Sequence, residues 1–85
     1  MQDLKEYQKQ IIASFDIISK KYEDRLYTTC TRDCLYQDLF NLYKDNIEPF
    51  LGKELGKEVF KESLIQYCGF SYGVTMFKDL FSLYD

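Results

Sequence analysis

Two long stripes of apolar residues, stepping by three or four positions, constrain the fold of this chain most strongly. Steps of three and four place side chains on one face of an α-helix, whereas a half-buried strand needs strict alternation. The stripes predict a helix over residues 3–27 and a last helix over residues 57–83. Their members are Leu4, Tyr7, Ile11, Phe15, Ile18, Tyr22 and Leu26, and then Phe60, Leu64, Tyr67, Phe70, Val74, Phe77, Phe81 and Tyr84.

A further helix is predicted between the two stripes. Thr29, Thr31 or Asp33 can cap its first turn, because short polar side chains accept hydrogen bonds from free backbone N–H groups. The helix should end near Glu48, since a residue before proline is pushed out of the α region. Its apolar positions are Leu35, Leu39, Leu42, Tyr43 and Ile47.

These elements predict an all-α fold, a small bundle of three to four helices with long first and last helices. Residues 1–85 form a single helical domain, and residues 49–56 form a connection with some helical content. The residues expected in the core are Phe15, Ile18, Leu39, Leu42, Phe60, Leu64, Phe70, Val74 and Phe77.

Gly69 and Gly73 lie four positions apart inside the predicted last helix. Glycine costs about 1 kcal/mol relative to alanine in a helix interior, so the pair indicates that another surface approaches closely. That surface is either helix 1, in the region of residues 11–18, or a partner helix in a homodimer or a target protein. The spacing also occurs in membrane helix dimers, but the polar Gln66, Lys78 and Asp79 nearby exclude a membrane span.

The residues of catalytic and metal sites are scarce. The chain has no histidine, which is the commonest general base and metal ligand. Carboxylates at 54, 58 and 62 alternate with lysines at 53, 57 and 61, the pattern of a salt-bridged helix face. We therefore predict no enzymatic activity, no cofactor, no metal and no small-molecule substrate.

Cys30, Cys34 and Cys68 are odd in number, and their spacing does not match a zinc site. Because neither a secretory leader nor a membrane-length apolar run is present, we expect a reduced cytoplasmic protein.

The net charge of −3 and the pI of about 4.9 argue against binding to nucleic acid, which requires neutralisation of phosphates. A basic run of Lys20, Lys21, Arg25 and Arg32 keeps a nucleic-acid-binding regulator as an alternative, although acidic residues interrupt it.

Eight tyrosines and seven phenylalanines are more rings than so small a core easily hides. Exposed tyrosine is enriched at protein interfaces. We therefore expect a protein interface, whose candidate residues are Tyr36, Tyr43, Gly69, Tyr72, Gly73 and Met76.

The segment of residues 67–81 resembles the C-terminus of a group of uncharacterised small helical proteins from Gram-positive bacteria, their phages and mobile elements. These proteins often end in Gly-Phe-x-x-Gly-x-x-Met, followed by an acidic residue and two apolar ones. The residues that match are Gly69, Phe70, Gly73, Met76 and Asp79-Leu80-Phe81, with the acidic residue one place late. The resemblance implies a mobile-element setting and carries no activity.

Together these features favour a non-enzymatic protein–protein interaction domain that inhibits or modulates a host or defence protein, as anti-CRISPR proteins do. A self-assembling helical module that forms a homodimer is the alternative of a different class, beside the nucleic-acid-binding regulator.

Overall fold

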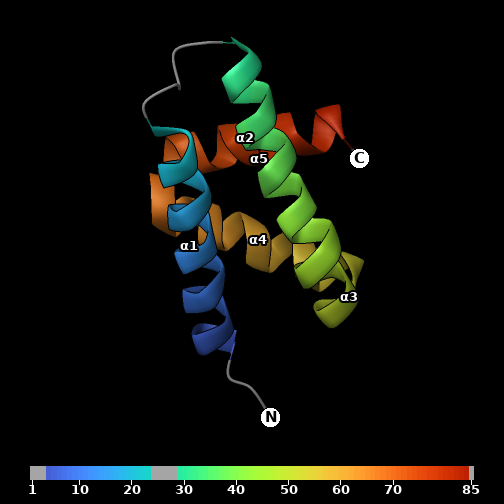
Figure 1. Cartoon of the computed structure of the whole chain (residues 1–85). Helices are drawn as coiled ribbons and strands as arrows, with labels where there is room; N and C mark the ends of the chain where they lie inside the picture. Colours follow the sequence, from blue (N-terminus) through green and yellow to red (C-terminus); the bar gives the residue numbers. More distant parts are fainter. Residues whose placement is uncertain (1–3, 24–28, 85) are drawn as a thin grey trace.

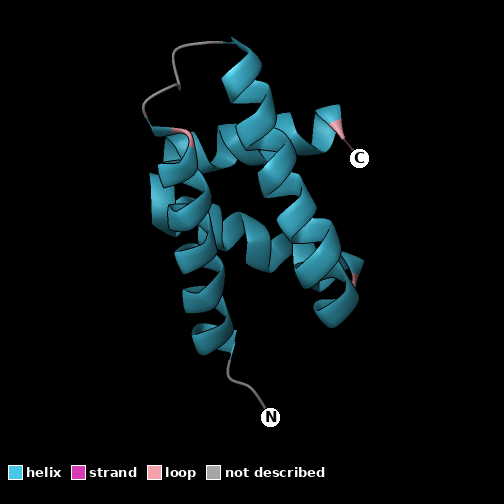
Figure 2. Cartoon of the chain, viewed as in Figure 1, coloured by secondary structure: helices cyan, strands magenta, loops and turns pink. Residues whose placement is uncertain are grey.

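The computed structural model describes residues 4–23 and 29–84, without the side chains of residues 29–32. Within these ranges the chain is helical and contains no strand, so the predicted all-α fold is confirmed (Figure 2). The elements in chain order are α1 Leu4–Lys21, α2 Thr29–Leu42, the π-helical turn η2 Tyr43–Ile47, α3 Glu48–Leu51, α4 Lys53–Cys68 and α5 Phe70–Leu83.

The helices form two crossed layers. Figure 1 shows α1 and α2 side by side in front, while α4 and α5 lie behind and run across them. The α4 and α5 helices fold back on each other at residue 69 and pack along their lengths. Each layer is a helical hairpin, and the core lies between the two hairpins.

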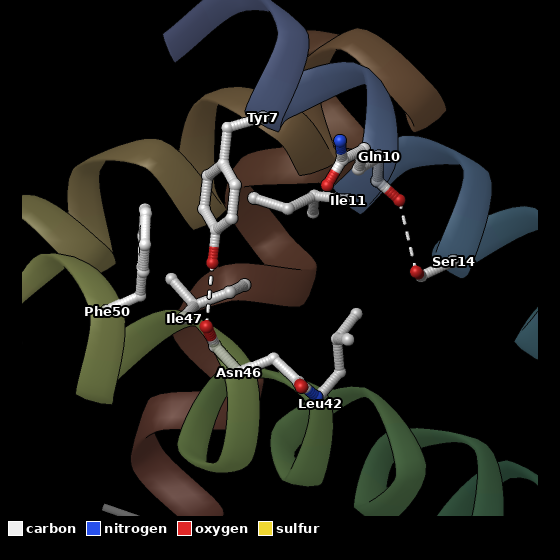
Figure 3. A pocket seen from close by; sticks show the side chains of 8 residues that line it. All are labelled: Tyr7, Gln10, Ile11, Ser14, Leu42, Asn46, Ile47 and Phe50. Carbon is white, nitrogen blue, oxygen red and sulfur yellow. Dashed lines mark hydrogen bonds between the residues drawn. The ribbon is translucent and has the colours of Figure 1, made fainter. Parts of the chain in front are cut away.

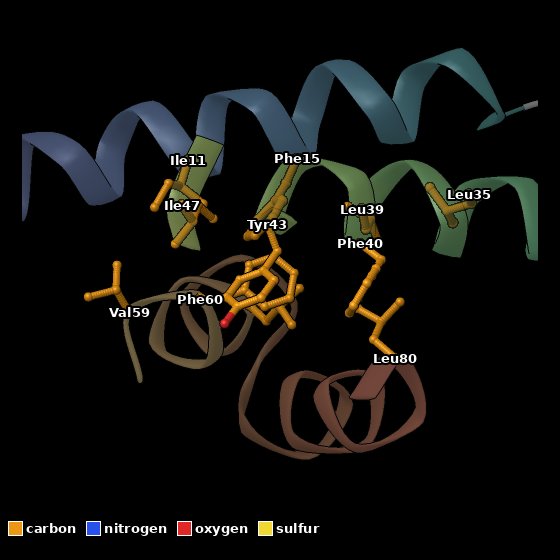
Figure 4. Packing of buried hydrophobic residues seen from close by; sticks show 11 residues of the cluster. Ile11, Phe15, Leu35, Leu39, Phe40, Tyr43, Ile47, Val59, Phe60 and Leu80 are labelled. Carbon is orange, nitrogen blue, oxygen red and sulfur yellow. The ribbon is translucent and has the colours of Figure 1, made fainter. Parts of the chain in front are cut away.

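Aromatic rings fill the centre of this core (Figure 4). Phe15, Tyr43 and Phe60 are fully buried, from α1, η2 and α4 in turn. The ring centroids of Phe15 and Phe60 lie 5.6 Å apart, and those of Tyr43 and Phe60 lie 5.4 Å apart. Since such ring pairs are attractive beyond the area that they bury, they lock the two layers together.

The predicted core is largely confirmed. Its buried members are Phe15, Leu39, Phe60 and Leu64, and its half-buried members are Ile18, Leu42, Val74 and Phe77. Phe70 is the error, because its side chain is 73% exposed at the start of α5.

The boundary of the predicted last helix is wrong, because the chain turns at Gly69. This residue has φ +91° and ψ 163°, a conformation that is essentially restricted to glycine. The apolar stripe nevertheless continues across the turn, because α4 and α5 face the same core. Gly73 therefore has its nearest contacts with Ile65 of α4, whereas the sequence favoured helix 1 as its neighbour.

Gly73 is buried where α5 passes α4. A β-carbon at this position would lie 2.6 Å from the Cα atom of Ile65 and 2.7 Å from its backbone nitrogen. Real atoms do not approach so closely, so only glycine fits without a shift of one helix. For Gly73 the structure confirms the interpretation of close packing within one chain.

The second predicted helix also extends beyond its expected end. Helical structure passes through Pro49 to Leu51 and begins at Thr29. Asp33 therefore lies inside α2 and does not cap it, while the side chains of Thr29 and Thr31 lie outside the described residues. The Glu48 N–H donates to the carbonyl of Tyr43, a bond that spans five residues and defines a π-turn. Pro49 has no N–H to donate, so it is tolerated in the first turn of α3.

The first helix is shorter than predicted: α1 ends at Lys21, and residues 24–27 of the predicted span lie outside the described residues. In the part of the chain that the structure describes, every helix is too short or too polar to cross a bilayer.

Candidate functional site

A groove of about 300 Å³ opens between α1 and the segment formed by η2 and α3 (Figure 3). We call it the α1–η2 groove. Residues 7–14 of α1 form one side, and the end of α2, η2 and α3 form the other. Its lining residues are Tyr7, Gln10, Ile11, Ser14, Leu42, Asn46, Ile47 and Phe50.

An aromatic pair closes one end of the α1–η2 groove. The Tyr7 hydroxyl donates a hydrogen bond of 2.7 Å to the backbone carbonyl of Asn46. The Tyr7 ring stacks on Phe50 with centroids 5.0 Å apart and planes at 27°. Phe50 is 60% exposed, so the pair presents apolar surface that is already held in place.

Burial raises the pKa of the Tyr7 phenol above its ordinary value. The phenol is therefore protonated at neutral pH and remains a hydrogen-bond donor. The bond joins α1 to η2, whose bonded residues are 39 positions apart in sequence, and so connects the two sides of the groove at this end.

The floor and the rim of the α1–η2 groove differ in chemistry. Ile11 and Ile47 are buried and form an apolar floor. Gln10 and Asn46 are exposed at the rim and offer amide donors and acceptors. The Ser14 hydroxyl already donates to the Gln10 carbonyl at 3.0 Å.

The π-turn explains why this segment can face the core and the groove at once. Tyr43 and Ile47, at its two ends, are both completely buried. Ile47 also reaches the floor of the groove, and the exposed Asn46 and Phe50 of the same short stretch line it as well. An inserted π-turn changes the phase of the helix, and such turns are frequent at functional sites.

The side chains that line the α1–η2 groove carry no formal charge, and Tyr7 is the only ionisable one among them. The groove therefore offers apolar, aromatic and hydrogen-bonding contacts and no acid–base pair. Its chemistry suits the binding of a neutral, partly apolar surface.

Two of the residues that the sequence indicated as an interface, Tyr43 and Gly73, are buried in the folded chain. Tyr43 is completely buried, and its hydroxyl donates to the Lys53 carbonyl at 3.3 Å. Gly73 is also buried, so neither contributes to the surface of the folded chain. Tyr36 and Met76 are half-buried, while Gly69 and Tyr72 are exposed near the turn between α4 and α5.

The α1–η2 groove was missed because its residues are far apart in sequence. In the sequence, Tyr7 is one member of the apolar stripe of helix 1. Asn46 and Phe50 flank Pro49, where periodicity gives no clear signal. The local sequence gives one indication of an exposed, irregular segment. The apolar Phe50 directly follows Pro49, and the polar Asn46 lies three positions before the proline.

The basic run of the nucleic-acid alternative is partly paired with acids. The Lys20 ammonium lies 3.2 Å from an Asp16 carboxylate oxygen, and this hydrogen bond raises the pKa of Lys20. Lys21 lies 3.4 Å from Asp38. Arg25 and the side chain of Arg32 lie outside the described residues. A continuous basic track is therefore not formed by the part of the run that is described.

The thiols of Cys34 and Cys68 are unpaired. Burial raises the pKa of the Cys68 thiol, which disfavours the reactive thiolate. Among residues 4–23 and 33–84, no three side chains of His, Cys, Asp or Glu are grouped so that they could hold a metal ion.

No family model, curated protein or solved structure matches the chain.

Proposed function

We propose that this chain is a non-enzymatic protein-binding module, and that it acts in the cytoplasm as an inhibitor or modulator of a host or defence protein. The proposed binding surface is the α1–η2 groove. The phage or mobile-element setting rests on the resemblance of residues 67–81, which includes Gly69, Phe70, Gly73 and Met76.

The observation that carries the proposal is the Tyr7–Phe50 pair. Residues that dominate protein interfaces are typically rigid aromatic side chains beside a pocket. Tyr7 is held by its hydrogen bond to Asn46, and Phe50 is held by the stacked Tyr7 ring. Such an anchor loses little conformational entropy when a partner binds.

The chemistry of the α1–η2 groove defines the partner surface that would fit. A volume of about 300 Å³ with an apolar floor accommodates one or two apolar side chains of a protein segment. The amides of Gln10 and Asn46 at the rim can bond to its backbone. Because the groove is uncharged, we expect the affinity to depend only weakly on salt concentration.

The proposal is tested with a matched pair of variants, Phe50→Ser and Phe70→Ser. Both replace an exposed phenylalanine close to a glycine turn, and only Phe50 lines the groove. The tagged wild type and both variants are exposed to a lysate of a Gram-positive host, and retained proteins are quantified by mass spectrometry.

We expect a protein that wild type and Phe70→Ser retain and Phe50→Ser loses. With the purified protein, Phe50→Ser should weaken affinity at least about tenfold, which corresponds to about 1.4 kcal/mol. Retention that is the same for wild type and Phe50→Ser would contradict the proposal. Loss with Phe70→Ser alone would instead place the interface on α5, near Tyr72.

A further inference from the structure

The two ends of α1 are fastened to the rest of the molecule in different ways. Toward the carboxyl end, the Phe15 ring packs against Phe60 and Tyr67 of α4, with ring centroids 5.6 Å and 5.9 Å apart. Directly after the helix, the Tyr22 hydroxyl donates to an Asp38 carboxylate oxygen of α2 at 2.7 Å. This end is therefore held by both α4 and α2.

The first two turns of α1, residues 4–10, depend on one apolar side chain. Leu4 is 45% exposed, whereas Tyr7 packs against the core. The Tyr7 hydroxyl bonds to the Asn46 carbonyl at 2.7 Å, and its ring stacks on Phe50 (Figure 3). Because a short stretch of helix is marginal in water without tertiary contacts, Tyr7 keeps these turns helical.

The floor of the α1–η2 groove is covered in the free chain. Ile11 is 4% exposed and Ile47 is 0% exposed, although both line the groove. A partner reaches more of this floor only when one side of the groove moves. In Figure 3 the Tyr7 side chain crosses from α1 to the Asn46 carbonyl beside Ile11 and Ile47, so its departure would uncover them.

We propose that residues 4–10 form a strap over the end of the α1–η2 groove, and that the Tyr7 hydroxyl is its latch. When the bond to the Asn46 carbonyl breaks, the first turns of α1 unwind and the floor becomes accessible. When the turns form again, Tyr7 stacks on Phe50 and closes the groove behind what has entered. The role of the strap as an entrance rests on the proposed function of the groove, whereas its motion is a property of the free chain.

The latch is weak enough to open without unfolding the whole chain. A neutral hydrogen bond contributes modestly to a folded state, because water replaces it when it breaks. Segments that are held by few buried contacts open at lower cost than the domain as a whole. The acceptor is a backbone carbonyl, so the latch requires the Tyr7 hydroxyl and not the Asn46 side chain.

Native-state hydrogen exchange of the purified chain, measured by NMR, tests the opening. In an α-helix the N–H groups of residues 8–11 donate to the carbonyls of residues 4–7, so their exchange follows the unwinding of the strap. Tyr7→Phe removes the latch and keeps the ring. Local opening exposes little surface and depends weakly on urea, whereas global unfolding depends on urea steeply.

Two control variants separate the latch from other effects. Tyr22→Phe removes a hydroxyl whose bond to Asp38 stays intact when only the strap opens. Asn46→Ala removes a side chain of the groove and keeps the backbone acceptor of the latch. The fold of each variant is checked by circular dichroism.

We expect residues 8–11 of the wild type to exchange faster than the buried part of α4, with little dependence on urea. Tyr7→Phe should speed their exchange about three- to tenfold, while both controls should keep the wild-type rate. Exchange at residues 8–11 that is as steep in urea as that of α4, or that Tyr7→Phe leaves unchanged, would overturn the proposal.

Thiol labelling tests whether the opening uncovers the floor. In a background where serine replaces the three native cysteines, Ile11→Cys and Ile47→Cys each place a thiol on the floor. Leu80→Cys is the control, because Leu80 is completely buried in α5, away from the groove. The reagent is 5,5′-dithiobis(2-nitrobenzoate).

The floor thiols should react faster than the thiol at position 80, and about three- to tenfold faster again when Tyr7→Phe is added. Floor thiols that react only as fast as the control would contradict the entrance, because the floor would then be uncovered only by global unfolding. Neither measurement involves a partner, so the two proposals fail separately. A strap that opens in a chain that retains no protein from the lysate contradicts the proposed function alone, and a partner lost with Phe50→Ser beside rates that Tyr7→Phe leaves unchanged contradicts the strap alone.

Discussion

The chain turns twice at a glycine, and the two corners share one local design. At the first corner Gly52 joins α3 to α4, and at the second Gly69 joins α4 to α5. Both have nearly the same backbone angles, with φ +89° and ψ 167° at Gly52 and φ +91° and ψ 163° at Gly69. Each is followed four positions later by another glycine, Gly56 or Gly73.

The hydrogen bonds of the two corners correspond one to one. The N–H of Gly52 donates to the Glu48 carbonyl, and the Gly52 carbonyl accepts from Gly56, both at 2.8 Å. Gly69 makes the same two bonds, from its N–H to the Ile65 carbonyl and from Gly73, also at 2.8 Å. A single glycine therefore ends one helix and begins the next, with few backbone groups left without partners.

The corners differ in how closely the second glycine approaches the preceding helix. A β-carbon on Gly56 would meet the Cα of Glu48 at 3.6 Å and a methyl of Ile47 at 3.4 Å, which are ordinary contacts. On Gly73 it would meet the backbone of Ile65 at 2.6 Å. The same Gly-x-x-x-Gly spacing thus requires glycine at both positions in one corner and only at the first position in the other.

The largest expected effect is that of Gly73→Leu. The leucine side chain would collide with the backbone of Ile65. The α4 and α5 helices would then have to move apart and would lose part of the packing between them. We expect a loss of about 3 kcal/mol in the free energy of unfolding, the upper end of the usual cost of overpacking. Urea unfolding measures it, and a loss below about 1 kcal/mol would show that the corner opens easily.

Gly52→Ala and Gly69→Ala should have the next largest effects, and the two should be similar. A β-carbon meets nothing within 4 Å at either position, so the cost is only that of the strained backbone. We expect each to lose about 1–3 kcal/mol in urea unfolding. A large difference between them would mean that the two corners are not equivalent at their first glycine.

Gly56→Ala should have a smaller effect, of the opposite sign. The added methyl group finds ordinary contacts beside Ile47, Tyr43 and Glu48. Alanine is also favoured over glycine within a helix by up to about 1 kcal/mol. The melting temperature should therefore rise or stay constant, and a clear fall would place the first corner in the same class as the second.

The smallest effect is expected for Phe70→Ala, directly after the second corner. Because this side chain is 73% exposed, its removal creates no cavity. The free energy of unfolding should change by less than about 0.5 kcal/mol, as for most surface substitutions. A loss of several kcal/mol would restore Phe70 to the core, where the sequence had placed it.

The sequence was sufficient for the fold class and for part of the core, because the spacing of Phe15, Leu39, Phe60 and Leu64 reports a helical face directly. It was not sufficient for the corners. When two helices fold back on one core, the apolar stripe of the first continues into the second with unbroken steps of three and four. At Gly69 a positive φ angle turns the chain, and the spacing of the apolar residues is the same as it would be in one straight helix.

The candidate site was still less accessible from the sequence. Tyr7 and Asn46 meet only because α1 lies beside η2 in the folded chain, and no local pattern joins them. Tyr43 and Ile47, at the two ends of the π-turn, are both buried. The surplus of tyrosines places Tyr43 among the candidate interface residues, whereas its position on the apolar face of the second helix agrees with its burial at the centre of the core.

The most direct test of the difference between the two corners is the sign of the stability change in Gly73→Ala, measured by urea unfolding of the monomer at low concentration. Helix propensity alone would make alanine stabilising by up to about 1 kcal/mol. The 2.6 Å approach to Ile65 predicts instead a net loss of about 1–3 kcal/mol. A gain in stability would contradict this account, because it would mean that α4 and α5 do not meet closely at Gly73.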